Sequence, residues 1–225
     1  MGGSSIPLGR FFGVFVRFDV TLLLLAAFFV LRGLERGGFQ GALNELTFVV
    51  LLFVCVFLHE LGHAAAAYVF GIRTLDVTLH FFGGYARLSS PPRRRFDDAV
   101  ISFAGPAVNL AIAGLLYLWK EQIVTDENTW NAYYLVRNLW WANLFLGIFN
   151  LLPGYPLDGG NITRAVLSNW MTHARARLIV AYLGVAIGFG LVAYGFPDSI
   201  FTMIFGGLFI YLASMEIQAA QSSRF

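Results

Sequence analysis

The segment FVVLLFVCVFLHELGHAAAAYVFG, residues 48–71, decides how the rest of this sequence is interpreted. It is apolar enough to lie in a lipid bilayer, yet it contains His59, Glu60 and His63. An ionisable side chain near the centre of a membrane helix costs roughly 2.5–3.5 kcal/mol on insertion scales, so such residues are expected to face a polar interior and to serve a function. The segment therefore predicts a membrane helix that carries a functional site.

The composition of the whole chain is typical of a membrane protein. Of its 225 residues, 58% are hydrophobic and 12% are charged, whereas a soluble domain carries about 25% charged residues. A membrane span requires about 20 apolar residues. Six apolar stretches can be drawn, at about 18–33, 45–70, 98–119, 138–172 with an interruption, 175–195 and 199–216. We expect an all-α polytopic membrane protein with about six transmembrane helices, in which residues 1–225 form a single transmembrane domain.

The charged connections predict the orientation of these spans. Basic residues cluster before the first span, between the second and third, and between the fourth and fifth: Arg10, Arg17, Arg93, Arg94, Arg95, Arg164, Arg175 and Arg177. The other connections carry mixed or acidic charge. By the positive-inside rule we expect a multi-pass protein of the cell membrane, a prokaryotic inner or plasma membrane, with both termini in the cytoplasm. No basic patch is mixed with exposed aromatic residues, so we expect no nucleic-acid partner.

The connection GIRTLDVTLHFFGGYARLSSPPRRR, residues 71–95, alternates polar and apolar residues around Gly83 and Gly84 as a β-hairpin does. Phe81 and Phe82 make it too apolar for an ordinary loop, and it is too short to span. A sheet edge cannot face lipid, so a hairpin that enters the membrane has to line a protein cavity. We expect a re-entrant β-hairpin; an interfacial hairpin with no catalytic part is the alternative.

The sequence HELGH, residues 59–63, matches the H-E-x-x-H pattern of zinc proteases. Histidines at i and i+4 share one face of a helix, so His59 and His63 can both reach one Zn²⁺ ion. Glu60, between them, can polarise a metal-bound water. A catalytic zinc takes three protein ligands, so a third must come from elsewhere in the chain.

Asp158 is the candidate for this third ligand. It lies within the segment NLLPGYPLDGG, residues 150–160, where two prolines and three glycines interrupt the fourth apolar stretch. Unwound backbone at membrane depth is tolerated where it lines a site. At 1.5 Å per residue, His59 and Asp158 can reach the same depth in the cytoplasmic half of the bilayer. The alternative is that Asp158 only caps the helix that follows.

Together these residues resemble the site-2 proteases, peptidase family M50, which are intramembrane zinc metalloproteases that cut transmembrane segments of their substrates. The resemblance rests on HELGH, on NLLPGYPLDGG and on SFAGPAVNL at residues 102–110, and it covers most of the chain. It implies one Zn²⁺ on His59, His63 and Asp158, with Glu60 as the general base. The chain departs from some members in showing no recognisable PDZ or cystathionine-synthase-type domain.

The resemblance also implies two elements that bind substrate. Asn150 matches an asparagine that binds substrate or the oxyanion, and the hairpin with Gly83 and Gly84 matches an element that presents the substrate as an added strand. Asn109, in a segment of small residues, is expected to serve close helix packing. The expected function is hydrolysis of a peptide bond within or near the transmembrane segment of a membrane-anchored protein, in regulated intramembrane proteolysis or in clearance of signal-peptide remnants.

Two other functions remain open from the sequence. Intramembrane His and Asp residues could instead carry metal ions across the membrane in a transporter, although the unbroken apolar run before His59 offers no polar path. A protein that only binds membrane helices is expected to lack Glu60 or a ligand, and all are present. The sequence leaves the oligomeric state unknown.

Overall fold

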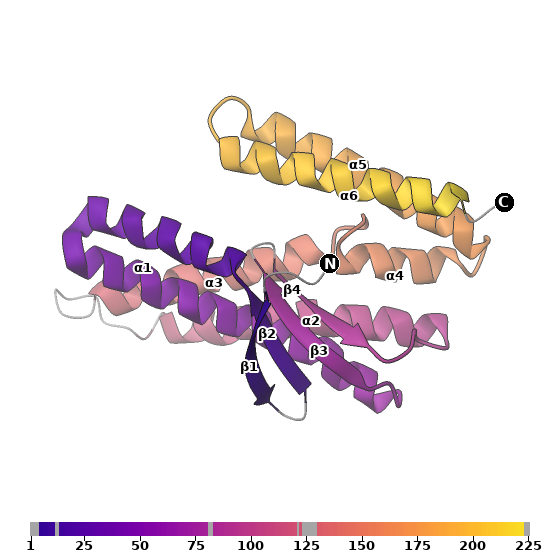
Figure 1. The fold of residues 1–225 in the computed structure, drawn as a ribbon, viewed down its shortest axis with the longest axis horizontal. Coiled ribbons are helices and arrows are strands. Elements are labelled where there is room, and N and C mark those ends of the chain that lie inside the picture. The colour runs from indigo at the N-terminus through magenta and orange to yellow at the C-terminus, as the bar shows by residue number, and fades with distance from the viewer. Residues whose placement is uncertain (1–4, 12–13, 81–82, 121, 123–129, 223–225) are drawn as a thin grey trace. The chain divides into compact units, whose positions relative to one another are not determined.

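A computed structural model of the chain describes residues 5–11, 14–80, 83–120, 122 and 130–222, in which six helices and four strands form (Figure 1). These residues divide into two compact units. The first comprises Met1–Pro91 and Ala104–Gly147, and the second comprises Pro92–Phe103 and Ile148–Phe225. Each unit is described by itself.

The elements follow in chain order. The strands are β1 (Ser5–Phe11), β2 (Val14–Asp19), β3 (Thr74–His80) and β4 (Gly83–Leu88). The helices are α1 (Thr21–Val69), α2 (Arg95–Lys120), α3 (Trp130–Asn150), α4 (Asp158–Leu167), α5 (His173–Gly195) and α6 (Ile200–Ser222).

Helix α1 contains both of the first two predicted spans. It is 49 residues long and is interrupted at Gly37 and Gly38, whose backbone angles are not helical. Gly38 has a φ of 58° and a ψ of −145°, a region that glycine occupies almost alone. The two halves fold back on each other in Figure 1, and Gly33 and Gly41 let their backbones meet: a Cβ atom at Gly33 would lie 2.6 Å from the Gly41 carbonyl oxygen.

The predicted hairpin is confirmed as the antiparallel pair β3 and β4, although Phe81 and Phe82 lie outside the described residues. The sheet is larger than the sequence indicated. Its order is β1-β2-β3-β4, with β1 and β2 supplied by the N-terminal segment and β2 parallel to β3. The N-terminal strands were missed because their apolar residues run directly into the apolar start of α1. The sheet packs on α1 through a core that contains Leu22, Val56, Val77 and Leu79.

An ion pair holds the register of β3 and β4. Asp76 and Arg87 are cross-strand partners, and both Nε and Nη2 of Arg87 donate to Oδ2 of the buried Asp76 carboxylate. The hydrogen bond to Asp76 raises the pKa of the Arg87 guanidinium. Because a buried carboxylate requires a partner, a slip of β4 by one residue would leave Asp76 without its cation.

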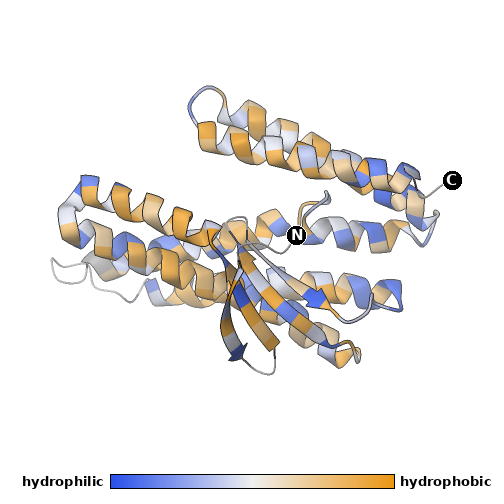
Figure 2. Cartoon of the chain, viewed as in Figure 1, coloured by the Kyte–Doolittle hydropathy of each residue, from blue (hydrophilic) through white to orange (hydrophobic). Residues whose placement is uncertain are grey.

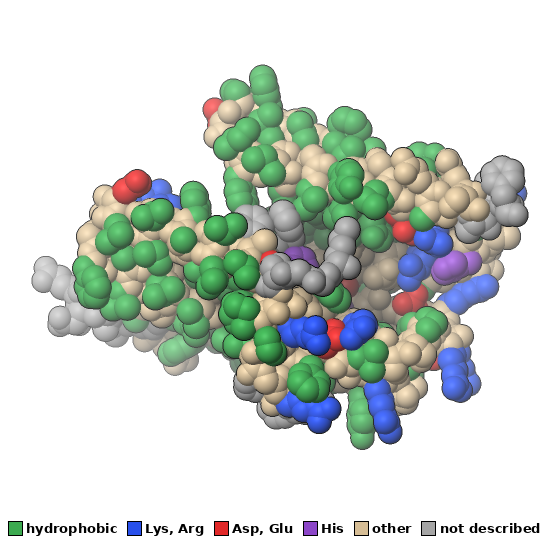
Figure 3. All heavy atoms as spheres, viewed as in Figure 1, with side chains coloured by type: hydrophobic (Ala, Val, Ile, Leu, Met, Phe, Trp, Pro, Cys, Tyr) green, Lys and Arg blue, Asp and Glu red, His purple; other side chains and the backbone are tan. Residues whose placement is uncertain are grey.

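Four of the described helices, α1, α2, α5 and α6, are long and apolar enough to cross a membrane, so the chain is a multi-pass membrane protein. Hydrophobic residues cover most of their length, and Figure 3 shows such side chains over the visible faces of α1, α5 and α6 (Figures 2 and 3). Helix α3 is not among the four, because Asn, Tyr and Trp residues lower its hydropathy. The count of six spans stays a prediction.

In the second unit, α5 and α6 lie side by side (Figure 1). Gly188 and Gly206 allow the close contact, since a Cβ atom at Gly188 would lie 2.8 Å from the Gly206 carbonyl oxygen. Arg177 of α5 donates to Glu216 of α6 at 2.8 Å. Within the same unit, Arg164 of α4 donates at 3.0 Å to Asp98, in the first turn of α2.

Candidate metal centre

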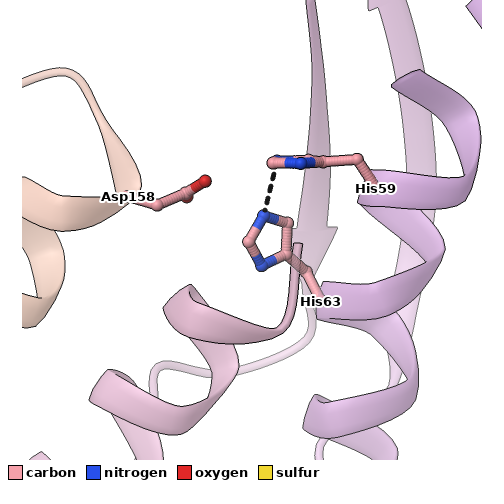
Figure 4. Close-up of side chains that lie close together, drawn as sticks. All are labelled: His59, His63 and Asp158. Carbon is pink, nitrogen blue, oxygen red and sulfur yellow. Dashed lines mark hydrogen bonds between the residues drawn. The ribbon is translucent and has the colours of Figure 1, made fainter. Parts of the chain in front are cut away.

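The two histidines of HELGH lie one helical turn apart on α1 in the first unit. Their Nε2 atoms are 3.1 Å apart, and the ring planes are inclined by 83° (Figure 4). Two nitrogen ligands at about 2.0–2.1 Å from a tetrahedral zinc ion are separated by about 3.3 Å. The pair is therefore already close to the separation that one zinc ion imposes, and the residues fit the group.

Helix α2 passes directly beside this nitrogen pair. A Cβ atom at Gly105 would lie 2.3 Å from His63 Nε2 and 2.7 Å from His59 Nε2. Gly62 of α1 makes a similar approach to α2, with 2.8 Å between its hypothetical Cβ and the Ala104 carbonyl oxygen. The glycine in SFAGPAVNL thus keeps the space beside the two Nε2 atoms clear of side chains.

Glu60 lies beneath the sheet. Its side chain is buried, with 5% of the residue exposed, and strand β4 crosses directly over it. A Cβ atom at Gly84 would lie 2.7 Å from Glu60 Cγ and 2.9 Å from Oε1. The Gly-Gly pair of the hairpin therefore brings the backbone of β4 into contact with the side chain of Glu60.

A chain of buried amides supports His59 from the other side. Asn109 of α2 and Asn143 of α3 are both fully buried. Asn109 Oδ1 lies 2.5 Å from His59 Nδ1, and Asn109 Nδ2 donates to Asn143 Oδ1 at 2.9 Å. The prediction that Asn109 serves only helix packing was incomplete. A buried amide in an apolar helix needs hydrogen-bond partners, and this signal could have linked Asn109 to a buried site.

The other two predicted site residues belong to the second unit. Asn150 is the last residue of α3 and Asp158 is the first residue of α4, separated by the irregular segment 151–157. Leu157 is the N-cap of α4, so Asp158 is not the capping residue that the alternative required. Figure 4 draws Asp158 with the two histidines; each of the three residues can offer one ligand atom to a metal ion.

Glycines fix the position of Asp158 within its unit. A Cβ atom at Gly159 would lie 2.2 Å from the Leu151 carbonyl oxygen, and one at Gly160 would lie 2.7 Å from that of Gly154. The backbone N–H of Tyr155 donates to the Val180 carbonyl of α5 at 3.1 Å. The segment before α4 is therefore folded tightly against the first turn of that helix, which carries the carboxylate.

Comparisons with known proteins identify the family of this chain. The model of the family described as peptidase family M50 matches residues 47–124 and 120–191. The chain belongs to this family, the site-2 proteases.

Individual relatives extend the match to nearly the whole chain. A site-2 protease structure from Methanocaldococcus jannaschii matches with a TM-score of 0.73 and 27% identity, over 95% of each chain. A zinc metalloprotease of the same organism is 32% identical over 212 residues, which cover 94% of this chain and 60% of the relative. Stage IV sporulation protein FB of Bacillus subtilis is 29% identical over 129 residues, 57% of this chain and 43% of that protein. The chain thus spans about 60% of the length of the first of these curated relatives.

Proposed function

We propose that this chain is an intramembrane zinc metalloprotease that hydrolyses a peptide bond within or near the transmembrane segment of a membrane-anchored protein. The observation that carries the proposal is the pair of His59 and His63 Nε2 atoms, 3.1 Å apart on an apolar helix, with the Glu60 carboxylate buried next to them. The proposed role is regulated intramembrane proteolysis or the clearance of signal-peptide remnants.

Asp158 is the proposed third ligand of a single Zn²⁺ ion. Its carboxylate suits zinc, and three protein ligands leave one position open for catalysis. The position of Asp158 at the start of α4, where Leu157 rather than Asp158 is the N-cap, is consistent with a role other than capping. We also propose that residues 1–225 act as one catalytic domain.

The bound zinc would supply Lewis-acid activation of water and of the peptide carbonyl. Glu60 acts as the general base, taking a proton from the attacking water and passing it to the leaving amine. Its burial beneath β4 keeps the carboxylate away from bulk solvent.

Strand β4 is an edge strand of the four-stranded sheet, and this edge is the proposed docking site for the substrate. A transmembrane helix hides its carbonyls in hydrogen bonds and has to unwind before hydrolysis, and pairing with a strand edge holds a peptide extended. Gly83 and Gly84 are proposed substrate-binding residues, because Gly84 brings this strand to Glu60. Asn150, at the end of α3, is proposed to bind the substrate carbonyl or its oxyanion.

The experiment that tests this function compares wild type with Glu60→Gln during co-expression with tagged single-span proteins. Loss of a general base lowers the rate about 10²–10⁴-fold. We expect cleavage to be lost while one zinc per chain is retained, because Glu60 is not a ligand. Cleavage that survives the change contradicts the protease mechanism. Zinc uptake into vesicles that persists in Glu60→Gln would instead identify a transporter.

Asp158→Ala tests the third ligand. We expect this variant, like His63→Ala, to be purified with much less than one zinc per chain, as measured by elemental analysis. Asp198→Ala, in the connection before α6, is the control and is expected to retain its zinc.

A further inference from the structure

One backbone carbonyl sets the direction of every hydrogen bond in the amide chain behind His59. The Leu139 carbonyl oxygen can only accept, so the group that faces it at 2.8 Å has to be the Nδ2 amino group of Asn143. Oδ1 of Asn143 then accepts from Asn109 Nδ2 at 2.9 Å. This leaves Asn109 Oδ1 facing His59 Nδ1 at 2.5 Å. An oxygen acceptor at this distance requires a proton on His59 Nδ1.

The position of the proton on the ring decides whether a histidine can bind a metal. A neutral imidazole carries one proton, so a proton on Nδ1 leaves Nε2 with its lone pair. His59 Nε2 is the atom that faces His63 Nε2. If Asn109 were flipped, its amino group would face Nδ1 and favour the tautomer with the proton on Nε2, which cannot coordinate zinc.

We propose that Asn143 holds Asn109 against this flip and thereby keeps His59 in the tautomer that binds metal through Nε2. The inference rests on the proposed function, in which His59 is a zinc ligand. Asn109 and Asn143 are positioning residues, since their contacts in this chain run to His59, to each other and to α3.

The surroundings of Asn143 support a fixed orientation. Asn143 is fully buried, so no bulk water competes for its amide. Its Nδ2 donates to the Leu139 carbonyl, one turn earlier on α3, and its Oδ1 accepts from Asn109. Reversing the amide would set Oδ1 against the Leu139 carbonyl oxygen, which leaves two buried acceptors face to face. The orientation is therefore determined by the fold before any metal binds.

A pair of substitutions separates this role from simple packing. Asn143→Leu removes the group that prevents the flip, so a fraction of His59 should adopt the wrong tautomer. Asn109→Asp places a carboxylate beside His59 Nδ1, and a carboxylate has no donor face to turn toward the ring. In the Asn109→Asp background, Asn143 has no flip to prevent.

The zinc affinity of the purified full chain in detergent, measured by chelator competition, is the test. Losing a group that orients a ligand typically lowers metal affinity about 10–100-fold, and we expect a loss of this size for Asn143→Leu. The double variant should bind zinc no more weakly than Asn109→Asp alone, because the flip no longer exists in that background. A loss from Asn143→Leu that is equal in both backgrounds, or no loss at all, overturns the proposal.

Two further measurements keep the test decisive. Nitrogen-15 shifts of the histidine rings in metal-free protein report the tautomer, with the His59 signal identified by its absence in His59→Ala among the four histidines of the chain. Asn143→Leu should shift this signal toward the Nε2-protonated form, and an unchanged signal counts against the proposal. Asn138→Leu, a half-buried position on the same helix, is the matched control and should leave affinity and tautomer unchanged.

The failure of the inference is distinct from the failure of the proposed function. If His59→Ala keeps its zinc, His59 is not a ligand and both fail. If His59→Ala loses zinc while Asn143→Leu binds like wild type, only the inference fails. Asn143→Ala is tested in parallel, so that poor folding of the leucine variant does not decide the outcome.

Discussion

The lack of a side chain at Gly105 leaves room for the proposed metal centre. The hypothetical Cβ at this position falls 2.3 Å from His63 Nε2 and 2.7 Å from His59 Nε2, in the space beside both ligand atoms. Both atoms are the ends of side chains, so a methyl group can be accommodated only if the rings rotate away. The rotation would destroy the separation that suits one zinc ion.

We therefore expect Gly105→Ala to lose bound zinc while the protein still folds. Elemental analysis of the purified chain should show well below one zinc per molecule. Gly114→Ala is the matched control on the same helix, since a Cβ there meets nothing within 4 Å. It should keep its zinc and gain up to about 1 kcal/mol from helix propensity. Equal zinc contents in the two variants would contradict the assignment.

Gly84→Ala is predicted to have a different effect. Its methyl group would meet Glu60 Cγ at 2.7 Å and displace the carboxylate proposed as the general base, without touching a proposed ligand. We expect kcat to fall at least tenfold while zinc affinity stays as in wild type. Tyr85→Phe, whose side chain points to the opposite face of the strand, is the control. If Gly84→Ala loses zinc instead, the site is more tightly coupled to β4 than we infer.

The histidine pair proposed to bind zinc could be identified from the sequence, whereas the residues that contact it could not. His59 and His63 are recognisable because their spacing is set by the helix itself. The contact of Asn109 with His59 joins residues 50 positions apart, and Asn143 lies on a third helix. Such contacts depend on how helices pack, and a single sequence does not contain the packing angle.

At the scale of elements, the turn within α1 depends on a glycine contact. Gly33 is buried and its hypothetical Cβ would lie 2.6 Å from the Gly41 carbonyl oxygen and 2.8 Å from Ala42 Cα. These are backbone atoms of the returning half of the helix, so they cannot move independently.

Gly33→Ala should therefore lower the free energy of unfolding by about 1–3 kcal/mol, as overpacking does. The unfolding midpoint in detergent measures the loss. Gly114→Ala is again the control, because a Cβ there meets nothing within 4 Å and the position lies inside a helix. Similar midpoints for the two variants would show that the halves of α1 are less tightly packed than in this structure.

The elements differ in how far the sequence determines them. The hairpin around Gly83 and Gly84 could be predicted because its alternation is local. The N-terminal strands could not, since residues 14–19 lead directly into the apolar residues of α1. They form strands because β2 pairs with β3, which follows α1 in the sequence.

At the scale of the whole molecule, the sheet constrains the path of the chain through the membrane. Strands β2 and β3 are neighbours in one sheet, yet α1 separates them in the sequence. The chain leaves this sheet along the first half of α1 and returns to it along the second half. The two halves of α1 therefore cross the membrane in opposite directions. This argument is independent of the arginine distribution, which by itself predicts cytoplasmic termini.

Cysteine labelling tests the proposed orientation. The chain has one cysteine, so Cys55→Ser gives a background without thiols. A cysteine at the exposed Arg94, before α2, should react with an impermeant reagent only from the cytoplasmic side. A cysteine at the exposed Glu35, before the turn of α1, should react only from the outside. Reversed labelling would refute the orientation, and labelling of both from one side would refute the two crossings.

The parallel pairing of β2 with β3 also has a consequence for biogenesis. During synthesis β1 and β2 leave the ribosome first, and a two-stranded hairpin is marginally stable by itself. It has to wait until residues 20–73 have been made before β3 can join it, a contact of large sequence separation. Strand β4, which covers Glu60, is added after β3. The carboxylate is therefore enclosed only in chains whose α1 has already been synthesised, which makes the covering of Glu60 a late step in the folding of this unit.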